Sequence, residues 1–331
     1  MKSSVKIKHN CFRRNPLKER SWHVTIILFF MSVSMSLFAQ DHERVDATIL
    51  LYPHSFDSPE QLSKFITRDF KTEEDKVRGI YSWIIQNIAY EPDEFKQFNY
   101  NFKDYRERNE KEEKTREKII NRTLKKGIAV CEGYAMLFEK LCELQGISNY
   151  LVRGDIKTNF NDIGRPFKKS HMWNIAVIDG KQYLFDPTWG AGRYHGKFIK
   201  EPSYFYYKTK PELFLKTHYP SMYEDALVDT VLPKEVFSGM PLLILKELEL
   251  DHVERPLGGI IRTEEYFDTI GFTITNFNPK EIKYTYGSDL MEVKDKEIID
   301  GKLHFEIPIE SEAKTLLIYF DEQPALGYKI L

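Results

Sequence analysis

Cysteine is scarce in this sequence, which contains three cysteines in 331 residues. Cys11 lies in a basic N-terminal segment, so a chain that has lost this segment keeps only Cys131 and Cys142. If both lie on one helix, a rise of about 1.5 Å per residue separates them by roughly 16 Å. A disulfide requires Cα atoms within about 7 Å of each other. The two thiols therefore cannot pair, which excludes a small disulfide-stabilised scaffold and leaves Cys131 in need of another explanation.

The sequence also lacks an excess of positive charge. Its 48 Lys and Arg residues face 50 Asp and Glu residues, for a formal net charge of −2. Residues 1–39 hold seven of the basic residues and one Glu, so the chain without them carries a net charge of about −8. Nucleic-acid binding requires a basic stripe, and none is present. Nucleic acid is therefore not expected as a partner.

The N-terminal apolar run is shorter than the roughly 20 residues of a membrane-spanning helix. It extends without a charge from Val24 to Phe38, follows a basic start, and is followed by the small residue Ala39. This pattern is typical of a secretory signal peptide over residues 1–39, with Gln40 as the first residue of the mature chain. We therefore expect an exported protein, periplasmic or secreted, with a retained N-terminal membrane anchor as the alternative.

Two helices are predicted near the start of the mature chain. Residues 59–71 have helical spacing, and a stronger helix follows Thr72, a good N-cap that precedes an acidic first turn. The stronger helix is expected to end near Tyr90, because Pro92 disfavours helical backbone in the residue before it. The dense charge run at 103–118 is expected to form a solvated helix or a mobile loop.

A largely apolar helix is predicted directly after Cys131. Ala135, Phe138 and Cys142 recur at helical spacing, and Gly146 stands where the glycine that ends a helix belongs. Cys131 therefore falls at or next to the first turn of this helix.

The pattern changes to extended after Gly146. Residues 150–154 are expected to form one strand, and residues 171–178 and 181–186 to form a hairpin around the two-residue turn Asp179–Gly180. Residues 198–241 are expected to wrap the first domain, which spans residues 40–241. From residue 242 to residue 331, alternating stretches at 243–250, 269–276, 302–309 and 315–320 predict a β-sandwich-like second domain.

The position of Cys131 suits a nucleophile. A thiol attacks only as the thiolate, and a helix N-terminus stabilises the thiolate through its unpaired N–H donors and positive potential. Taken alone, a cysteine that opens an apolar helix is more often a small core residue.

The predicted hairpin supplies two partners for such a cysteine. Pairing around the turn sets Trp173 opposite Asp186 and His171 opposite Thr188, so Asp186 is the diagonal same-face neighbour of His171. An Asp beside a His fixes the imidazole tautomer and stabilises the imidazolium, and the other ring nitrogen is then left to take a thiol proton. Cys131, His171 and Asp186 are therefore the predicted catalytic residues.

Two segments resemble the transglutaminase-like superfamily, namely GIAVCEGYAMLF and SHMWNIAVIDGKQYLFDPTWGAG. The likeness is greatest to the branch that contains the kyphoscoliosis peptidase, hillarin and cytokinesis protein 3, and it covers about residues 70–241. It implies an α+β fold with a papain-like core, in which the helix that bears the cysteine packs on an antiparallel sheet. It also implies that Cys131 is the nucleophile, His171 the general base and Asp186 the residue that orients His171.

The implied reaction is acyl transfer from a peptide or glutamine carbonyl, either to water, as in a peptidase or deamidase, or to an amine, as in a transglutaminase. The substrate is then a protein or peptide, and the C-terminal β-rich domain is expected to bind protein or cell-surface material. A non-catalytic interaction or scaffold protein is the alternative. Trp173 and Trp189 flank the His and the Asp; they are candidate substrate-binding residues, although a role in shielding the hydrogen bond from water is favoured.

No cofactor or metal site is expected. The segment GAGRYHG (190–196) lacks the strand, turn and helix setting of a nucleotide-binding loop, so a tight turn is favoured there. Six further histidines show no metal-ligand spacing: His42, His54, His195, His218, His252 and His304.

Overall fold

The computed structural model describes residues 42–97, 105–310 and 312–331. The chain divides into two units, residues 1–51 and residues 52–331. In the first unit residues 42–49 are helical, and the predicted signal peptide lies outside the described residues. None of the helices in the described ranges combines the length and the apolar composition needed to cross a membrane. All that follows concerns the second unit.

The first helices of this unit lie close to their predicted positions. α2 spans Pro59–Asp69 and α3 spans Glu73–Asn87. Thr72 caps α3 as predicted, because its side chain accepts a hydrogen bond of 3.1 Å from the Asp75 N–H. The charge run at 103–118 belongs, from residue 105 onward, to the long helix α4 (Tyr105–Lys126).

The predicted end of α3 near Tyr90 is wrong. The helix stops at Asn87, and β1 (Ala89–Tyr90) pairs in parallel with β2 (Ile128–Ala129). The Ala89 N–H donates to the Gly127 carbonyl at 2.7 Å and the Glu91 N–H donates to the Ala129 carbonyl at 2.9 Å, so the ladder replaces the last helical turn. This pairing sets Tyr90 opposite Ala129, just before Cys131.

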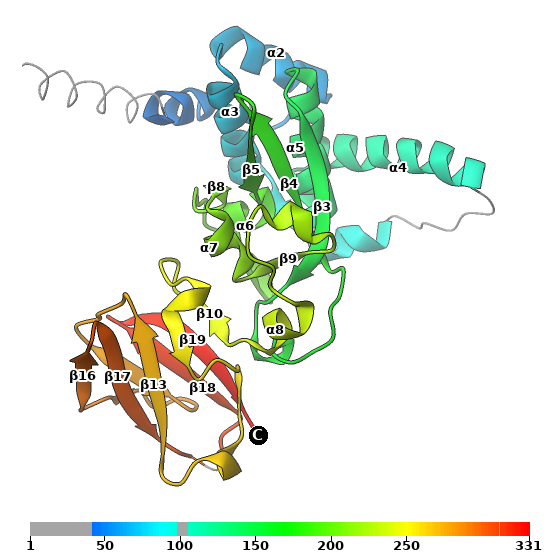
Figure 1. The fold of residues 1–331 in the computed structure, drawn as a ribbon. Coiled ribbons are helices and arrows are strands. Elements are labelled where there is room, and N and C mark those ends of the chain that lie inside the picture. The colour runs from blue at the N-terminus through cyan, green and yellow to red at the C-terminus, as the bar shows by residue number, and fades with distance from the viewer. Residues whose placement is uncertain (1–41, 98–104, 311) are drawn as a thin grey trace, which may run out of the picture. The chain divides into compact units, whose positions relative to one another are not determined.

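A helix on an antiparallel sheet forms the centre of the unit, as the family resemblance implies. α5 spans Cys131–Leu144 and packs closely against the sheet, where Asn174 Nδ2 donates to the Ala135 carbonyl at 3.0 Å (Figure 1). The sheet has the order β8-β5-β4-β3-β9. Its strands are β3 (Asn149–Ile156), β4 (His171–Ile178), β5 (Lys181–Phe185), β8 (Tyr207–Thr209) and β9 (His218–Pro220).

The β4–β5 hairpin has the predicted register. Ile178 pairs with Lys181 and Asn174 with Phe185, and the turn residues Asp179 and Gly180 have φ angles of 49° and 77°. Such positive angles at both turn positions match the twist of the two strands.

The hairpin is shorter than predicted, since β5 ends at Phe185 and not at Asp186. Asp186 is instead the N-cap of the short helix α6 (Pro187–Ala191). Pro187 has no N–H to donate to a ladder, and the Asp186 side chain accepts from the Thr188 and Trp189 N–H groups, which starts a helix. The predicted backbone pairs of Trp173 with Asp186 and of His171 with Thr188 therefore do not form.

Residues 198–241 do more than wrap the first domain. They complete β7 (Lys197–Lys200), which pairs with β6 (Gly192–His195), and they form α7 (Pro211–Leu215), η3 (Tyr223–Ala226) and α8 (Lys234–Gly239). They also supply β8 and β9, which extend the central sheet at its two edges.

The C-terminal part is rich in strands, which confirms the predicted fold class. One sheet has the order β10-β19-β18-β14-β15, with β12 paired to β19, and the other has the order β11-β13-β17-β16. Buried residues from both sheets, such as Phe272, Leu303, Ile318 and Leu326, share one apolar cluster. The strands are β10 (Leu242–Leu243), β11 (Val253–Arg255), β12 (Ile260–Ile261), β13 (Thr269–Thr275), β14 (Ile282–Thr285), β15 (Met291–Glu292), β16 (Lys296–Ile299), β17 (Lys302–Pro308), β18 (Thr315–Phe320) and β19 (Gln323–Ile330).

One predicted strand of this part is wrong. Only the first residue of the 243–250 stretch lies in a strand, β10. Three carbonyls of the segment, those of Leu245, Lys246 and Leu248, turn toward the Lys216 Nζ, at 2.6, 2.9 and 3.1 Å, and not toward a neighbouring strand. The domain boundaries at residues 39 and 241 stay predictions.

Candidate active site

Cys131 is the first residue of α5, as the sequence predicts. Its thiol is partly exposed. The N–H groups of Gly133 and Tyr134 both donate to the Val130 carbonyl, at 2.9 and 3.3 Å, so the first turn is tightly closed around the cysteine. The N–H groups that open a helix have no acceptor within it and carry the positive end of its dipole. A negative charge on the sulfur, or on an oxygen beside it, is therefore stabilised at this position.

Cys142 lies on the same helix but has a different character. It is a free thiol inside the core, and burial raises its pKa to about 12, although Asn149 opposes the shift. A thiol of this kind is inert at neutral pH.

His171 and Asp186 are brought together. His171 Nε2 lies 2.7 Å from Asp186 Oδ2, and 5% and 0% of the two side chains are exposed. Burial by itself lowers the pKa of His171, but the charge and hydrogen bond of Asp186, together with the influence of the neighbouring Cys131, outweigh it and raise this pKa to about 10. Since Nε2 binds the carboxylate, Nδ1 is the ring nitrogen left to accept a thiol proton.

The Asp186 carboxylate accepts four hydrogen bonds. Oδ1 accepts from the backbone N–H groups of Thr188, at 2.8 Å, and Trp189, at 3.1 Å. Oδ2 accepts from His171 and, at 3.0 Å, from Nε2 of His218. Burial favours the neutral acid, but the two histidines outweigh it and hold the pKa of Asp186 well below its ordinary value. The carboxylate is therefore charged and fixed in orientation.

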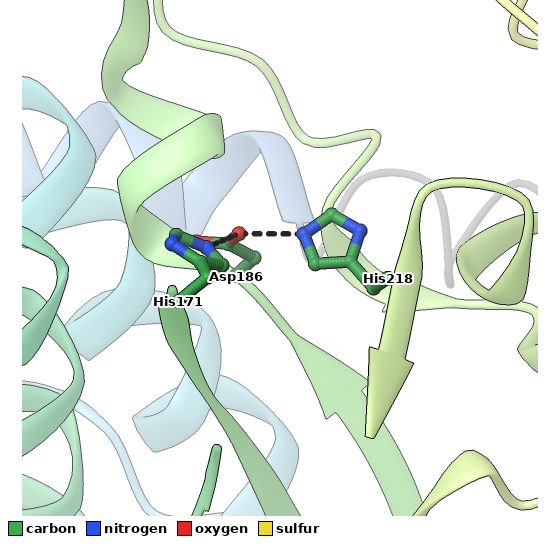
Figure 2. A group of neighbouring side chains, drawn as sticks. All are labelled: His171, Asp186 and His218. Carbon is green, nitrogen blue, oxygen red and sulfur yellow. Dashed lines mark hydrogen bonds and ion pairs between the residues drawn. The ribbon is translucent and has the colours of Figure 1, made fainter. Parts of the chain in front are cut away.

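His218 is the site residue that sequence reasoning missed. It approaches the carboxylate from the side opposite His171 (Figure 2). Its ring is fully buried and stacks on Phe214 at a centroid distance of 4.1 Å, with Trp189 at 4.5 Å. Burial lowers the pKa of His218 to about 4, with Asp186 opposing the shift, so the ring is neutral at pH 7. Its only sequence signal is its place within residues 70–241, the part of the chain that resembles the family, and this does not indicate a contact with Asp186.

The two predicted tryptophans lie around the histidines. Trp173 is 1% exposed, and its ring centroid is 6.2 Å from that of His171. Trp189 is partly buried, with its ring centroid 6.1 Å from that of His171. Rings in these positions exclude water from the hydrogen bond between His171 and Asp186, which strengthens it. Whether either ring contacts a substrate stays a prediction; only Trp189 has surface to offer.

A tyrosine, Tyr90, lies near Cys131. Burial and the charge of Cys131 raise the pKa of Tyr90 to about 12, so this hydroxyl lies near the sulfur and stays protonated. The ring of Tyr90 packs edge-on against Tyr194 of β6, at a centroid distance of 5.9 Å. Lys200 of β7 fixes this hairpin, because its Nζ donates to the Ile88 carbonyl at 2.6 Å.

The same buried cluster offers three possible metal ligands, since one atom each of His171, Asp186 and His218 lie within 4.8 Å of one another. These atoms already satisfy each other, because both Nε2 groups donate to the one carboxylate oxygen. An ion here would have to displace both protons. A second group of Glu249, Asp251 and His252 lies at a turn, where the Glu249 N–H donates to His252 Nδ1 at 3.2 Å. We assign no metal ligand in either group.

Comparison with known proteins finds a family match in one segment of the chain. Residues 60–187 match the family model described as Transglutaminase-like superfamily. This segment has a transglutaminase-like core. The match includes Cys131, His171 and Asp186 and ends before His218. The resemblance predicted from the sequence is confirmed.

Two curated relatives are similar to this chain. The kyphoscoliosis peptidase of Homo sapiens is 30% identical over 196 residues, which cover 56% of this chain and 27% of that protein. The kyphoscoliosis peptidase of Mus musculus is 29% identical over 169 residues, which cover 48% and 23%. The chain thus spans about a quarter of the length of these relatives. A crystal structure described as a TGase aligns with a TM-score of 0.27 and 14% identity, over 56% of this chain and 41% of that chain.

Proposed function

We propose that the protein is a cysteine-dependent acyl-transfer enzyme that acts on protein or peptide substrates. The observation that carries the proposal is the buried pair of His171 and Asp186, with Nε2 2.7 Å from Oδ2, beside a cysteine at the start of α5 that contributes to the raised pKa of His171. A thiol at a helix N-terminus, a base and a buried carboxylate in this order form the arrangement that activates a thiol. The name of the two relatives, a peptidase, supports an amide as the substrate bond.

In the first step His171 takes the thiol proton and Cys131 attacks the carbonyl carbon of the substrate. A C–S bond forms, and the π electrons of the carbonyl move to its oxygen. The resulting oxyanion lies at the start of α5, where the helix N-terminus and the Cys131 N–H stabilise negative charge. The carbonyl then re-forms, the C–N bond breaks, and His171 returns its proton to the leaving amine.

In the second step an acceptor releases the acyl group. His171, now neutral, takes a proton from water, whose oxygen attacks the thioester; a C–O bond forms, the C–S bond breaks and the thiolate leaves. An amine as acceptor forms a new amide by the same sequence. Asp186 stabilises the imidazolium in both steps without taking its proton.

Export is part of the same proposal, and it is supported by the basic start, the apolar run and Ala39 in residues 1–39. Expression of the full chain in a Gram-negative host, followed by fractionation and intact-mass measurement, tests it. We expect a periplasmic product whose mass corresponds to a chain starting at Gln40. A product that keeps Met1 and stays in the membrane fraction would support the retained anchor instead.

The reactivity of Cys131 tests the catalytic proposal against the scaffold alternative. An ordinary thiol of pKa about 8.5 is less than about 1% thiolate at pH 6. Because His171 accepts the proton of Cys131, we expect iodoacetamide to alkylate Cys131 at pH 6 at least about tenfold faster in the wild type than in His171→Ala. The rate is measured by mass spectrometry of the peptide that contains Cys131.

His304→Ala is the matched control, since His304 lies on β17 in the C-terminal sheets and its ring contacts only Thr273, at 3.3 Å, among the hydrogen bonds described. We expect this variant to react like the wild type. Equal rates in the wild type and in His171→Ala would show that no ion pair forms, and the interaction or scaffold alternative would then hold.

A further inference from the structure

We infer that His218 is a positioning residue of this site, which holds the second oxygen of Asp186 and limits how strongly that oxygen binds the proton of His171. The inference rests on the proposed function, because it concerns the proton that acyl transfer moves. His218 lies outside the segment that matches the family model.

The hydrogen bond to Asp186 fixes one proton of the His218 ring. A carboxylate only accepts, so Nε2, 3.0 Å from Asp186 Oδ2, must carry a proton. The other nitrogen, Nδ1, lies 2.8 Å from the hydroxyl of Thr217. A neutral ring with its proton on Nε2 lets the Thr217 hydroxyl donate to Nδ1, which satisfies both nitrogens.

The surroundings of His218 favour this neutral state. Its ring packs against the rings of Phe214 and Trp189 and is edge-on to Trp173 at a centroid distance of 5.3 Å. Gly154 on β3 makes room for Trp173, since a Cβ there would lie 2.3 Å from the indole ring and 2.2 Å from the Tyr219 carbonyl. A second positive charge among these aromatic rings, beside a protonated His171, would be strongly unfavourable.

His218 supplies a second hydrogen-bond donor to Oδ2 of Asp186, which no other residue of the site provides among the hydrogen bonds described. The backbone N–H groups of Thr188 and Trp189 hold Oδ1, and His171 holds Oδ2 from one side only. Without His218, a lone pair of the buried carboxylate would face only the surrounding aromatic rings and would have no hydrogen-bond donor, which is costly for a charged group. His218 therefore keeps the carboxylate ionised and in the plane that His171 requires.

Two donors on one oxygen also share its charge. A hydrogen bond to the charged form of a group stabilises that form, so the Nε2–H of His218 lowers the tendency of Oδ2 to attract the proton of His171. Without this donor, the negative charge of Oδ2 interacts with His171 alone, and the imidazolium of His171 becomes a weaker acid. The same proton must reach the leaving amine, so the loss slows acyl transfer.

The other ionisable groups near the cluster do not titrate at the upper midpoint. Burial lowers the pKa of Lys200 and of Lys216 to about 8, below that midpoint. Cys131, His171 and Asp186 are the groups already described. Tyr81, Tyr134 and Tyr206 lie near enough to be affected by the carboxylate, and burial, with the charge of Asp186, raises the pKa of each well above its ordinary value. These hydroxyls stay neutral, so a change in the pH profile of Cys131 reports on the two histidines.

The test compares His218→Phe with His218→Gln in the full chain. Phe fills the space of the imidazole ring without a hydrogen-bond donor, whereas Gln places an amide N–H close to the position of Nε2–H. The alkylation rate of Cys131 is measured from pH 5 to 11, and the upper midpoint of the profile marks the loss of the imidazolium proton. We expect His218→Phe to raise this midpoint by about one pH unit, in keeping with the loss of one charge-assisted hydrogen bond. We expect His218→Gln, which keeps a donor, to have the wild-type midpoint.

Phe305→Leu, in the core of the C-terminal sheets, controls for general loss of stability, and we expect its midpoint to match the wild type. The wild-type profile is measured first: if it is that of an ordinary thiol, the proposed function fails. If it shows the ion pair and His218→Phe leaves the upper midpoint unchanged, or His218→Gln shifts it as much, the positioning role is wrong.

A measurement on the wild type covers the case in which the variants do not fold. Two-dimensional ¹H–¹⁵N spectra of histidine-labelled protein distinguish the two neutral tautomers and the imidazolium. We expect His218 to be neutral with its proton on Nε2 at pH 6.5. A proton on Nδ1 alone, or a protonated His218 at that pH, would overturn the inference.

Discussion

Replacement of Cys131 by serine abolishes acyl transfer, with turnover expected to fall by about 10⁵-fold or more, the scale at which loss of a nucleophile acts in such sites. A serine hydroxyl is slightly smaller than the thiol and has the same connectivity, so the first turn of α5 keeps its shape. It ionises far less readily, and the site around Cys131 stabilises a thiolate and an imidazolium rather than a neutral pair. Turnover is measured as cleavage of a quenched peptide library and as amine incorporation into a glutamine-rich protein.

Cys142→Ala is the matched control for this variant. Cys142 lies on the same helix but is buried, so the change costs stability and leaves the site intact. We expect the folded fraction of Cys142→Ala to turn over substrate at the wild-type rate. Comparable activity in Cys131→Ser and the wild type, with either readout, would contradict a cysteine nucleophile.

Replacement of Asp186 by asparagine gives the second large effect, a loss in turnover of about 10³- to 10⁴-fold. The amide oxygen can still accept from the Thr188 and Trp189 N–H groups, so α6 keeps its N-cap. The amide NH₂ would then face two Nε2–H donors, those of His171 and His218, in place of the oxygen that accepts from both. His171 must shift its proton to Nδ1, which is the atom that has to accept the thiol proton.

The pH dependence of stability separates this cause from misfolding. Asp186 raises the pKa of His171 to about 10, against about 6.5 unfolded, so the ion pair stabilises the fold fully below pH 6.5 and less as the pH rises toward 10. The depressed pKa of Asp186 makes its own contribution disappear only as the pH falls below about 4. Urea denaturation should therefore show a larger gap between the wild type and Asp186→Asn at pH 5.5 than at pH 9.5. An equal gap at both would mean that the charge of Asp186 is not what stabilises the site.

The part of the site that the sequence predicts is the part that local geometry determines. A two-residue turn sets the register of β4 and β5, and this register makes His171 a neighbour of Asp186. The contact forms although β5 ends one residue early, because the N-cap geometry of Asp186 still directs Oδ2 toward His171. The apolar spacing after Cys131 likewise determines that it opens α5, since amphipathic spacing needs no long-range information.

The parts that escape prediction depend on long-range pairing. His218 reaches Asp186 because β9 pairs with β3 at the far edge of the sheet, which neither strand indicates by itself. Tyr90 comes beside Cys131 through a parallel pair of two-residue strands, too short to show a period. The segment after Leu243 reads as a strand, but its carbonyls bind the ammonium of Lys216, a residue far back in the chain.

Labelling with a peptide electrophile tests the central claim most directly. The full chain is treated at pH 6.5 with a peptidyl acyloxymethyl ketone, which reacts only slowly with ordinary thiols, and the modified residue is located by mass spectrometry. The arrangement of Cys131, His171 and Asp186 predicts a single modified residue, Cys131, and loss of the label in His171→Ala. An unlabelled Cys131 in the folded wild type, or equal labelling in His171→Ala, would contradict a catalytic role for this site.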